Sequence, residues 1–189
     1  MAINLVESVQ QKLNIEELRK INPDTGEAID NGKPLNSFYQ LAIPAVLTGL
    51  YSFTRLDDKN TAALQMSPGS VLSSVFGDYK NTVISKIADS TGTSVPETTD
   101  KLEQIGTTSI DVVKENLSEK PLDSDVKKFF TGQRHTILSY LDPSLRLGKY
   151  MEDDTVDDST NKMEGPVSNL IQNIGQIFSA SGNDQKEEI

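Results

Sequence analysis

Apolar residues recur along most of the chain at the three- and four-residue spacing of amphipathic helices. The first set predicts a helix over about residues 2 to 12 and consists of Ile3, Leu5, Val6, Val9 and Leu13. Asn14 can cap a second short helix over residues 15 to 21, because its side chain can accept a backbone hydrogen bond. Glu16 and Glu17 would then lie in the first turn, where the helix dipole favours negative charge.

The most apolar stretch of the chain, FYQLAIPAVLTGLYSF, covers residues 38 to 53. It is apolar on nearly all sides, which predicts a helix buried in the core. Pro44 lacks a backbone N–H, so it should kink this helix or begin a new one. We expect four residues of the stretch to be among the most buried in the protein: Leu41, Val46, Leu47 and Leu50. The preceding residues, 22 to 37, combine Pro, Gly, Asn and Asp and predict an exposed loop or a small hairpin that turns at Asn31–Gly32.

Further helices follow, separated by residues that start and stop helices. They are predicted at about residues 59–66, 70–77, 78–92, 94–117, 123–130 and 133–141. Gly106 should loosen the longest of them, and Asp142–Pro143 should close the last. Sustained period-two alternation, the signature of strands, is almost absent. The pattern therefore predicts an all-α fold.

The end of the chain has a different organisation. Residues 152–164 are polar and acidic and predict a linker, and beyond it an amphipathic helix is predicted over residues 165–180. The apolar stripe of that helix, called the C-terminal stripe below, consists of Val167, Leu170, Ile171, Ile174, Ile177 and Phe178. The tail, 181–189, should be disordered. The chain is thus expected to be a compact multihelical domain over residues 1–151 with a tethered C-terminal helix.

Composition and charge restrict the classes of partner. The 18 basic residues are scattered among 28 acidic ones and the formal net charge is −10, which argues against nucleic acid and anionic membranes as partners. Cysteine is absent, so disulfides and thiolate chemistry are excluded. The N-terminal sequence lacks the basic and apolar regions of a signal peptide, and no apolar run is long enough to span a bilayer. We therefore expect a cytoplasmic protein without membrane insertion.

Three segments carry a family pattern: IPAVLTGL at 43–50, SVLSSVFGDYKNTVISKIADSTGTS at 70–94, and KKFFTGQRHTILSYLDPSLRLG at 127–148. Together, over about residues 1–150, they resemble the bacterial family of unknown function 937, which includes YidB-like proteins. The resemblance implies an all-helical fold of bacterial origin. It implies no catalytic residues.

Residues of catalytic type are few. His135 is the only histidine and Cys is absent, so a zinc site built on histidines and thiolates lacks its ligands, and a catalytic triad would depend on this one residue. Ser124 with Lys127, and Ser159 with Lys162, match the Ser-x-x-Lys spacing in which a lysine deprotonates a nucleophilic serine. The first pair is better explained by a helix start and the second by the linker. We expect no catalytic residue and no cofactor.

The acidic linker contains one pattern typical of calcium loops. Oxygen-bearing residues occupy positions 1, 3, 5, 9 and 12 of an EF-hand loop, namely Asp153, Thr155, Asp157, Asn161 and Glu164. However, Asp158 stands at position 6, where the sharp turn needs Gly, and Thr160 stands where an aliphatic residue packs. We therefore expect no metal site.

The C-terminal stripe is the candidate partner-binding element, although packing on the protein's own core is the alternative. The polar face of its helix carries Ser, Asn and Gln but no Lys or Arg, which argues against binding to a membrane surface. A tethered amphipathic helix suits docking in a groove, in the same chain, on a second copy or on another protein. The expected function is a non-catalytic interaction or structural module. A carboxylate-based enzyme and a small-ligand or calcium binder are the alternatives.

Overall fold

Helices form nearly all of the regular structure in the computed structural model, which describes residues 3–22, 38–56 and 60–151. These residues contain no β-strand, so the predicted all-α fold is confirmed. In chain order the helices are α1 (Leu5–Leu13), α2 (Phe38–Phe53), η1 (Thr61–Gln65), α3 (Val71–Phe76), η2 (Gly77–Tyr79), α4 (Lys80–Thr91), α5 (Val95–Glu115), α6 (Asp123–Leu138), η3 (Pro143–Leu145) and α7 (Leu147–Met151), the η elements being 3-10 helices.

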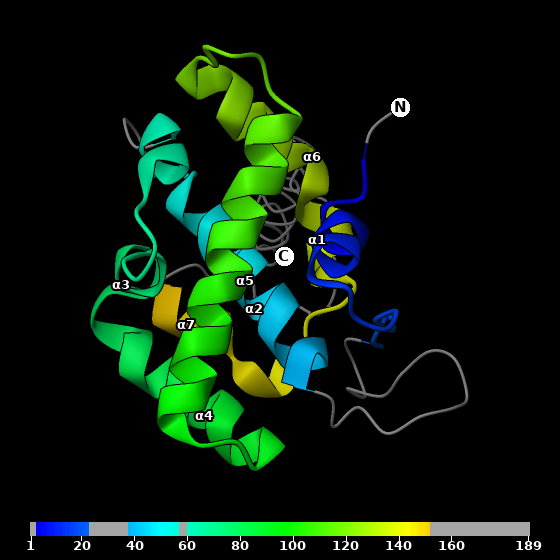
Figure 1. The fold of residues 1–189 in the computed structure, drawn as a ribbon, viewed down its shortest axis with the longest axis vertical. Coiled ribbons are helices and arrows are strands. Elements are labelled where there is room, and N and C mark those ends of the chain that lie inside the picture. The colour runs from blue at the N-terminus through cyan, green and yellow to red at the C-terminus, as the bar shows by residue number, and fades with distance from the viewer. Residues whose placement is uncertain (1–2, 23–37, 57–59, 152–189) are drawn as a thin grey trace, which may run out of the picture. The chain divides into compact units, whose positions relative to one another are not determined.

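Helix α2 forms the centre of the fold. It contacts α1, α3, α4, α5, α6 and α7, and α5 crosses in front of it in Figure 1. The four residues expected to be most buried are indeed buried, with Val46, Leu47 and Leu50 fully so. The helix continues through Pro44, whose carbonyl accepts a 2.7 Å hydrogen bond from the Thr48 hydroxyl. Pro44 therefore does not divide α2.

Helices α3 and α5 approach each other closely at Gly106. A Cβ atom at this position would lie 2.6 Å from Cγ1 of Val71, so only glycine fits here. One turn earlier on α5, the Glu103 carboxylate accepts hydrogen bonds from the backbone N–H groups of Val71 and Leu72, at 3.1 and 3.2 Å. These N–H groups lie in the first turn of α3 and have no partner inside that helix. The predicted loosening at Gly106 is wrong, because α5 is continuous and its glycine serves packing.

The prediction of a helix over residues 15 to 21 is also wrong. Asn14 adopts the left-handed conformation (φ 52°, ψ 48°) and ends α1 instead of capping a new helix. The following residues are not helical, and Leu18 and Ile21 are buried. The backbone N–H of Ile21 donates to the carbonyl of Ser139 at 2.9 Å. This segment is therefore fastened to the helical core by its backbone.

Two buried glutamines hold the N-terminal region in place. The side-chain amide of Gln40 both donates to the carbonyl and accepts from the N–H of Arg19, each at 2.9 Å. The side-chain amide of Gln133 accepts from the Leu5 N–H and donates to the Ile3 carbonyl, again at 2.9 Å. Each amide thus provides a hydrogen-bond partner for one backbone N–H and one backbone carbonyl that have no partner within a helix.

The helix starts and stops predicted from sequence are largely correct. Gly77 ends α3, Gly92 ends α4 in the left-handed conformation, and the Ser94 side chain caps α5. The separate helices predicted at 123–130 and 133–141 are instead one continuous helix, α6. Its buried residues lie on one face and are Val126, Phe130, Gln133 and Ile137. Their spacing is that of one uninterrupted amphipathic helix.

Candidate functional site

A recess opens between α1 and the chain that follows it. At Asn14 the chain turns, and the N–H of this residue bonds back to the carbonyls of Gln10 and Gln11. The chain then passes beside α1, where the Glu16 carbonyl accepts a hydrogen bond from Gln10. The resulting recess has a volume of about 360 Å³ and is lined by Glu7, Gln10, Gln11, Ile15 and Glu17. We call it the α1 recess.

Gln10 is the buried member of this lining, with only 4% of its surface exposed. Its Nε2 donates to the carbonyl of Glu16 at 3.0 Å, which fixes the orientation of the amide. Its Oε1 is buried and accepts no hydrogen bond within the described part of the chain. A buried acceptor without a donor is unfavourable, since it has lost its hydrogen bond to water. Gln10, one of the residues that line the α1 recess, therefore carries a buried unsatisfied acceptor.

Two carboxylates give the α1 recess a negative charge. Glu7 and Glu17 are both exposed, and Asn4 donates from Nδ2 to Oε1 of Glu7 at 2.7 Å. The pKa of the Tyr140 phenol is raised above its ordinary value, and burial is the largest cause. The negative charges of Glu7 and Glu17 raise this pKa further. A side-chain hydrogen bond between Asn4 and Tyr140 lowers the pKa of the phenol. The two negative charges therefore lie near one buried phenol.

Two further recesses flank the turn between α5 and α6. One has a volume of about 570 Å³ and the other about 560 Å³. Their apolar lining comes from Ile3, Leu64, Leu117, Pro121 and Phe129. Leu122, at the end of the same turn, is 68% exposed. The end of the fold that carries this turn therefore offers apolar contact surface.

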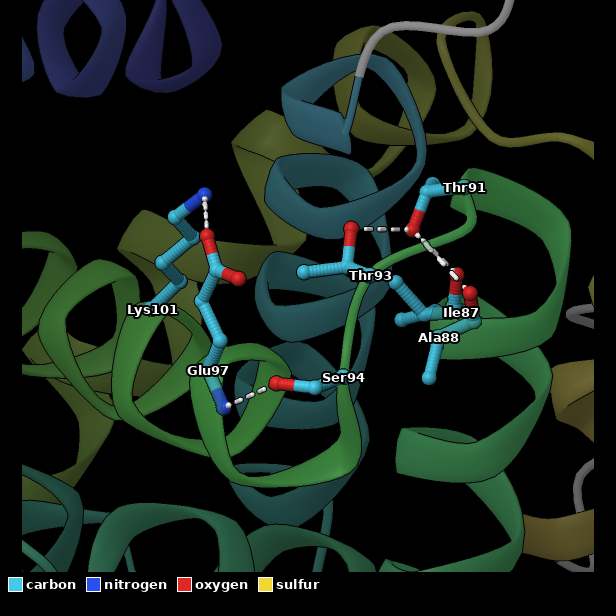
Figure 2. A network of polar contacts seen from close by, with 7 residues as sticks. All are labelled: Ile87, Ala88, Thr91, Thr93, Ser94, Glu97 and Lys101. Carbon is cyan, nitrogen blue, oxygen red and sulfur yellow. Dashed lines mark hydrogen bonds and ion pairs between the residues drawn. The ribbon is translucent and has the colours of Figure 1, made fainter.

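Figure 2 shows two groups of polar contacts where α4 joins α5. The Thr91 hydroxyl bonds to carbonyls in the last turn of α4 and lies 2.9 Å from the Thr93 hydroxyl. The Ser94 hydroxyl then accepts from the Glu97 N–H at 3.4 Å, and the Glu97 carboxylate pairs with Lys101 at 2.7 Å. The hydrogen bond to Glu97 is the largest cause that raises the pKa of Lys101. These are capping and one-turn contacts, so they define the junction of the two helices.

The Asp123 carboxylate makes a comparable structural contact. Its Oδ1 accepts from the backbone N–H of Thr61 at 2.7 Å, which ties the first turn of α6 to η1. Hydrogen bonds from Thr61 stabilise the charged form and lower the pKa of Asp123. The Asp123 carboxylate therefore has a structural role, since it joins α6 to η1.

The candidates singled out from sequence are distributed as follows. The C-terminal stripe (Val167, Leu170, Ile171, Ile174, Ile177 and Phe178) and the calcium-like loop from Asp153 to Glu164 lie outside the described residues. His135 is exposed on α6, and Ser124 and Lys127 are exposed near the start of that helix. Within residues 3–22, 38–56 and 60–151, no group of three or more His, Cys, Asp or Glu side chains is arranged to hold a metal. None of the helices in these ranges combines the length and apolar character needed to cross a bilayer.

Sequence reasoning missed the three buried glutamines. Gln40 had a detectable signal, because it is a polar residue within an otherwise apolar helix. Gln10 and Gln133 had none, since both have polar neighbours along the chain. Their burial depends on contacts with distant segments, which no local pattern encodes.

Comparison of the chain with known proteins found no related sequence or structure. No protein-family model, no curated protein and no solved structure matches the chain. The resemblance to YidB-like proteins over about residues 1–150 therefore stays a prediction.

Proposed function

We propose that this chain is a non-catalytic protein-interaction module of the bacterial cytoplasm that associates through the C-terminal stripe, a second copy of the chain being the simplest partner. The supporting observation is that the described residues leave few large apolar side chains exposed. The large apolar residues that they leave exposed are scattered through the fold, namely Leu56, Tyr79, Val95 and Leu122. The C-terminal stripe is different, because it concentrates six large apolar residues at helical spacing in one short segment.

Burial of such a stripe is energetically substantial. Each large apolar side chain contributes about 1.5 to 3 kcal/mol when it is fully removed from water. A helix of this length is marginal in isolation and needs a surface for stability. Because the opposite face carries no Lys or Arg, a protein surface suits it better than an anionic membrane.

The use of polar groups in the described part of the chain also favours a structural or interaction role. Gln40, Gln133, Glu103 and Asp123 each bind the backbone of another segment. Carboxylate-based catalysis would instead need carboxylates that face a substrate. Small-ligand binding, the other alternative, is favoured by one observation, the α1 recess with its polar lining.

The test compares the apolar and polar faces of the predicted C-terminal helix. We would prepare a variant with Ile171→Asp and Ile174→Asp, and a matched control with Asn169→Asp and Asn173→Asp. The control introduces the same charge in the same segment on the opposite face. Light scattering measures the mass of each protein, and thermal unfolding measures the stability.

The proposal expects a dimer or larger species that only the apolar-face variant dissociates. A monomeric wild type whose melting temperature falls in the apolar-face variant would show that the stripe packs on its own domain, and the proposal would be wrong. A monomeric wild type that neither variant affects would also contradict association through a second copy.

A further inference from the structure

The two recesses beside the turn between α5 and α6 adjoin each other. Leu117, which is half-buried, and Ser118, which is exposed, line both of them. The other apolar residues of their lining are Leu64 and Pro121 in one recess, and Ile3 and Phe129 in the other. We call the two recesses together the Leu117 surface.

The apolar residues of the Leu117 surface are held in place by the core. The ring of Phe129 packs edge-on against that of the buried Phe130, with the ring centroids 5.7 Å apart. Leu117 packs against the core cluster, and the Ile3 carbonyl accepts a 2.9 Å hydrogen bond from the Gln133 side chain. A surface that is already ordered loses little conformational entropy when it binds a partner.

Charge distinguishes the Leu117 surface from the α1 recess. Three lysines line the Leu117 surface, namely Lys114, Lys120 and Lys128, and only two carboxylates, Glu119 and Asp125, accompany them. The α1 recess is lined by two glutamates and by no Lys or Arg. Although the chain as a whole carries a net charge of −10, the lining of the Leu117 surface is therefore slightly positive.

The sequence around the C-terminal stripe has the complementary charge. Residues 152–189 contain nine Asp and Glu but only two Lys, so they carry −7 of the net charge of −10. Residues 165–183, which include the stripe, contain no charged residue, and the acidic residues lie on both sides of them. An apolar segment with acidic flanks complements an apolar surface that carries lysines.

We propose that the Leu117 surface of one copy of the chain receives the C-terminal stripe of a second copy. The stripe would dock as an amphipathic helix in a groove, a recurring mode of protein recognition. Because the two copies are identical, the exchange can be reciprocal and close a symmetric dimer with two equal contacts. This inference rests on the proposed function and names the surface that receives the stripe.

The experiment places a nitroxide on the full-length chain, which has no cysteine of its own. The Ser118→Cys variant carries the nitroxide and is mixed with ¹⁵N-labelled wild type, so that NMR line broadening reports only contacts between copies. We expect selective broadening of the amide signals of residues 166–178. Val95→Cys is the control, since this exposed residue begins α5, a helix of 21 residues that is about 30 Å long, and lies at its opposite end. A nitroxide there should leave these signals sharp.

Substitutions in the Leu117 surface should weaken self-association, measured by analytical ultracentrifugation. Leu117→Asp should raise the dissociation constant about tenfold or more, because it puts a charge at the centre of an apolar contact. Val95→Asp, the matched change at an apolar residue outside this surface, should leave the constant unchanged. Lys128→Glu reverses one charge and should raise it about threefold. Lys128 is exposed, so this variant should fold even where Leu117→Asp perturbs packing.

The outcomes separate this inference from the proposed function. If the chain associates but a nitroxide at position 118 leaves residues 166–178 sharp, or broadens them no more than one at position 95, the stripe docks elsewhere and this inference is overturned while the proposed function stands. A monomeric chain would contradict both. Broadening that occurs only when the nitroxide and the ¹⁵N label are in the same molecule would show docking within one chain, and it would also contradict both.

Discussion

The side chain of Gln133 and the backbone of Leu5 are joined by a buried 2.9 Å hydrogen bond across 128 positions of sequence. The same amide also donates to the Ile3 carbonyl, so one side chain on α6 secures the start of α1. Glu7, Gln10 and Gln11 of the helix that this contact positions line the α1 recess. Long-range polar contacts to the backbone thus arrange the candidate site.

Replacement of Gln133 by Ala should destabilise the protein by about 1 to 3 kcal/mol, because it leaves a buried N–H and a carbonyl unpaired. Urea unfolding measures the change, and faster hydrogen exchange of the Leu5 amide would place it at α1. Gln104→Ala, on the exposed face of α5, is the matched control and should stay within about 0.5 kcal/mol of wild type. Equal effects of the two substitutions would show that the Gln133 contact does not stabilise the fold.

Gly106→Ala should cost about 1 to 3 kcal/mol, because its Cβ would overlap Val71 Cγ1 at 2.6 Å. Gly132→Ala on α6 is the control: nothing lies within 4 Å of its added Cβ, and a gain of about 0.5 to 1 kcal/mol is expected from helix propensity. Adding Val71→Ala to Gly106→Ala should cost less than the two separate losses combined. Denaturant unfolding that ranks the two glycine variants equally would contradict the close packing of α3 on α5.

Glu103→Ala should destabilise α3 by about 1 kcal/mol, the usual cost of losing an N-terminal cap. The local signature is faster hydrogen exchange at the Val71 and Leu72 amides, which lose their acceptor. Asp111→Ala removes a carboxylate from the exposed face of the same helix and should leave both amides protected. Unchanged exchange in Glu103→Ala would mean that the carboxylate does not cap α3 in solution.

Asp123 predicts a pH dependence of known sign. Its pKa is lowered in the folded protein from the ordinary value of 3.8, so its contribution to stability is present above about pH 3.8 and is lost as the pH falls through the folded pKa. The Asp123→Asn variant keeps an acceptor for Thr61 but removes the charge. The difference in urea midpoint between wild type and this variant should be largest near neutral pH and should shrink below pH 3.8. A difference that is constant with pH, or grows in acid, would refute this role of the charge.

Leu47→Ala should cost about 2 to 5 kcal/mol, since it truncates a fully buried side chain in the central helix. Leu56→Ala provides the control, because its side chain is 54% exposed. Denaturant unfolding should separate the two clearly. A loss below about 1 kcal/mol for Leu47→Ala would indicate that α2 is not the packing centre.

The sequence predicts the helices well where one residue decides the local structure. The Ser94 cap, the Gly92 stop and the burial of Leu47 all follow from local chemistry or periodicity. The prediction of a helix after Asn14 is wrong for a physical reason. Asn is common both as the N-cap that begins a helix and as the left-handed residue that ends one, and Asn14 ends α1. In the α1 recess the exposed carboxylates are readable from sequence, whereas the burial of Gln10 is not, because it depends on where the returning chain lies.

The most direct test of association through the C-terminal stripe is hydrogen exchange of residues 166–178 at two concentrations of the full-length chain. Pairing with a second copy is driven by mass action, so amide protection should rise when the chain concentration increases about a hundredfold. The Ile171→Asp and Ile174→Asp variant should show no such rise. Protection that is the same at both concentrations, or absent at both, would contradict the proposed association.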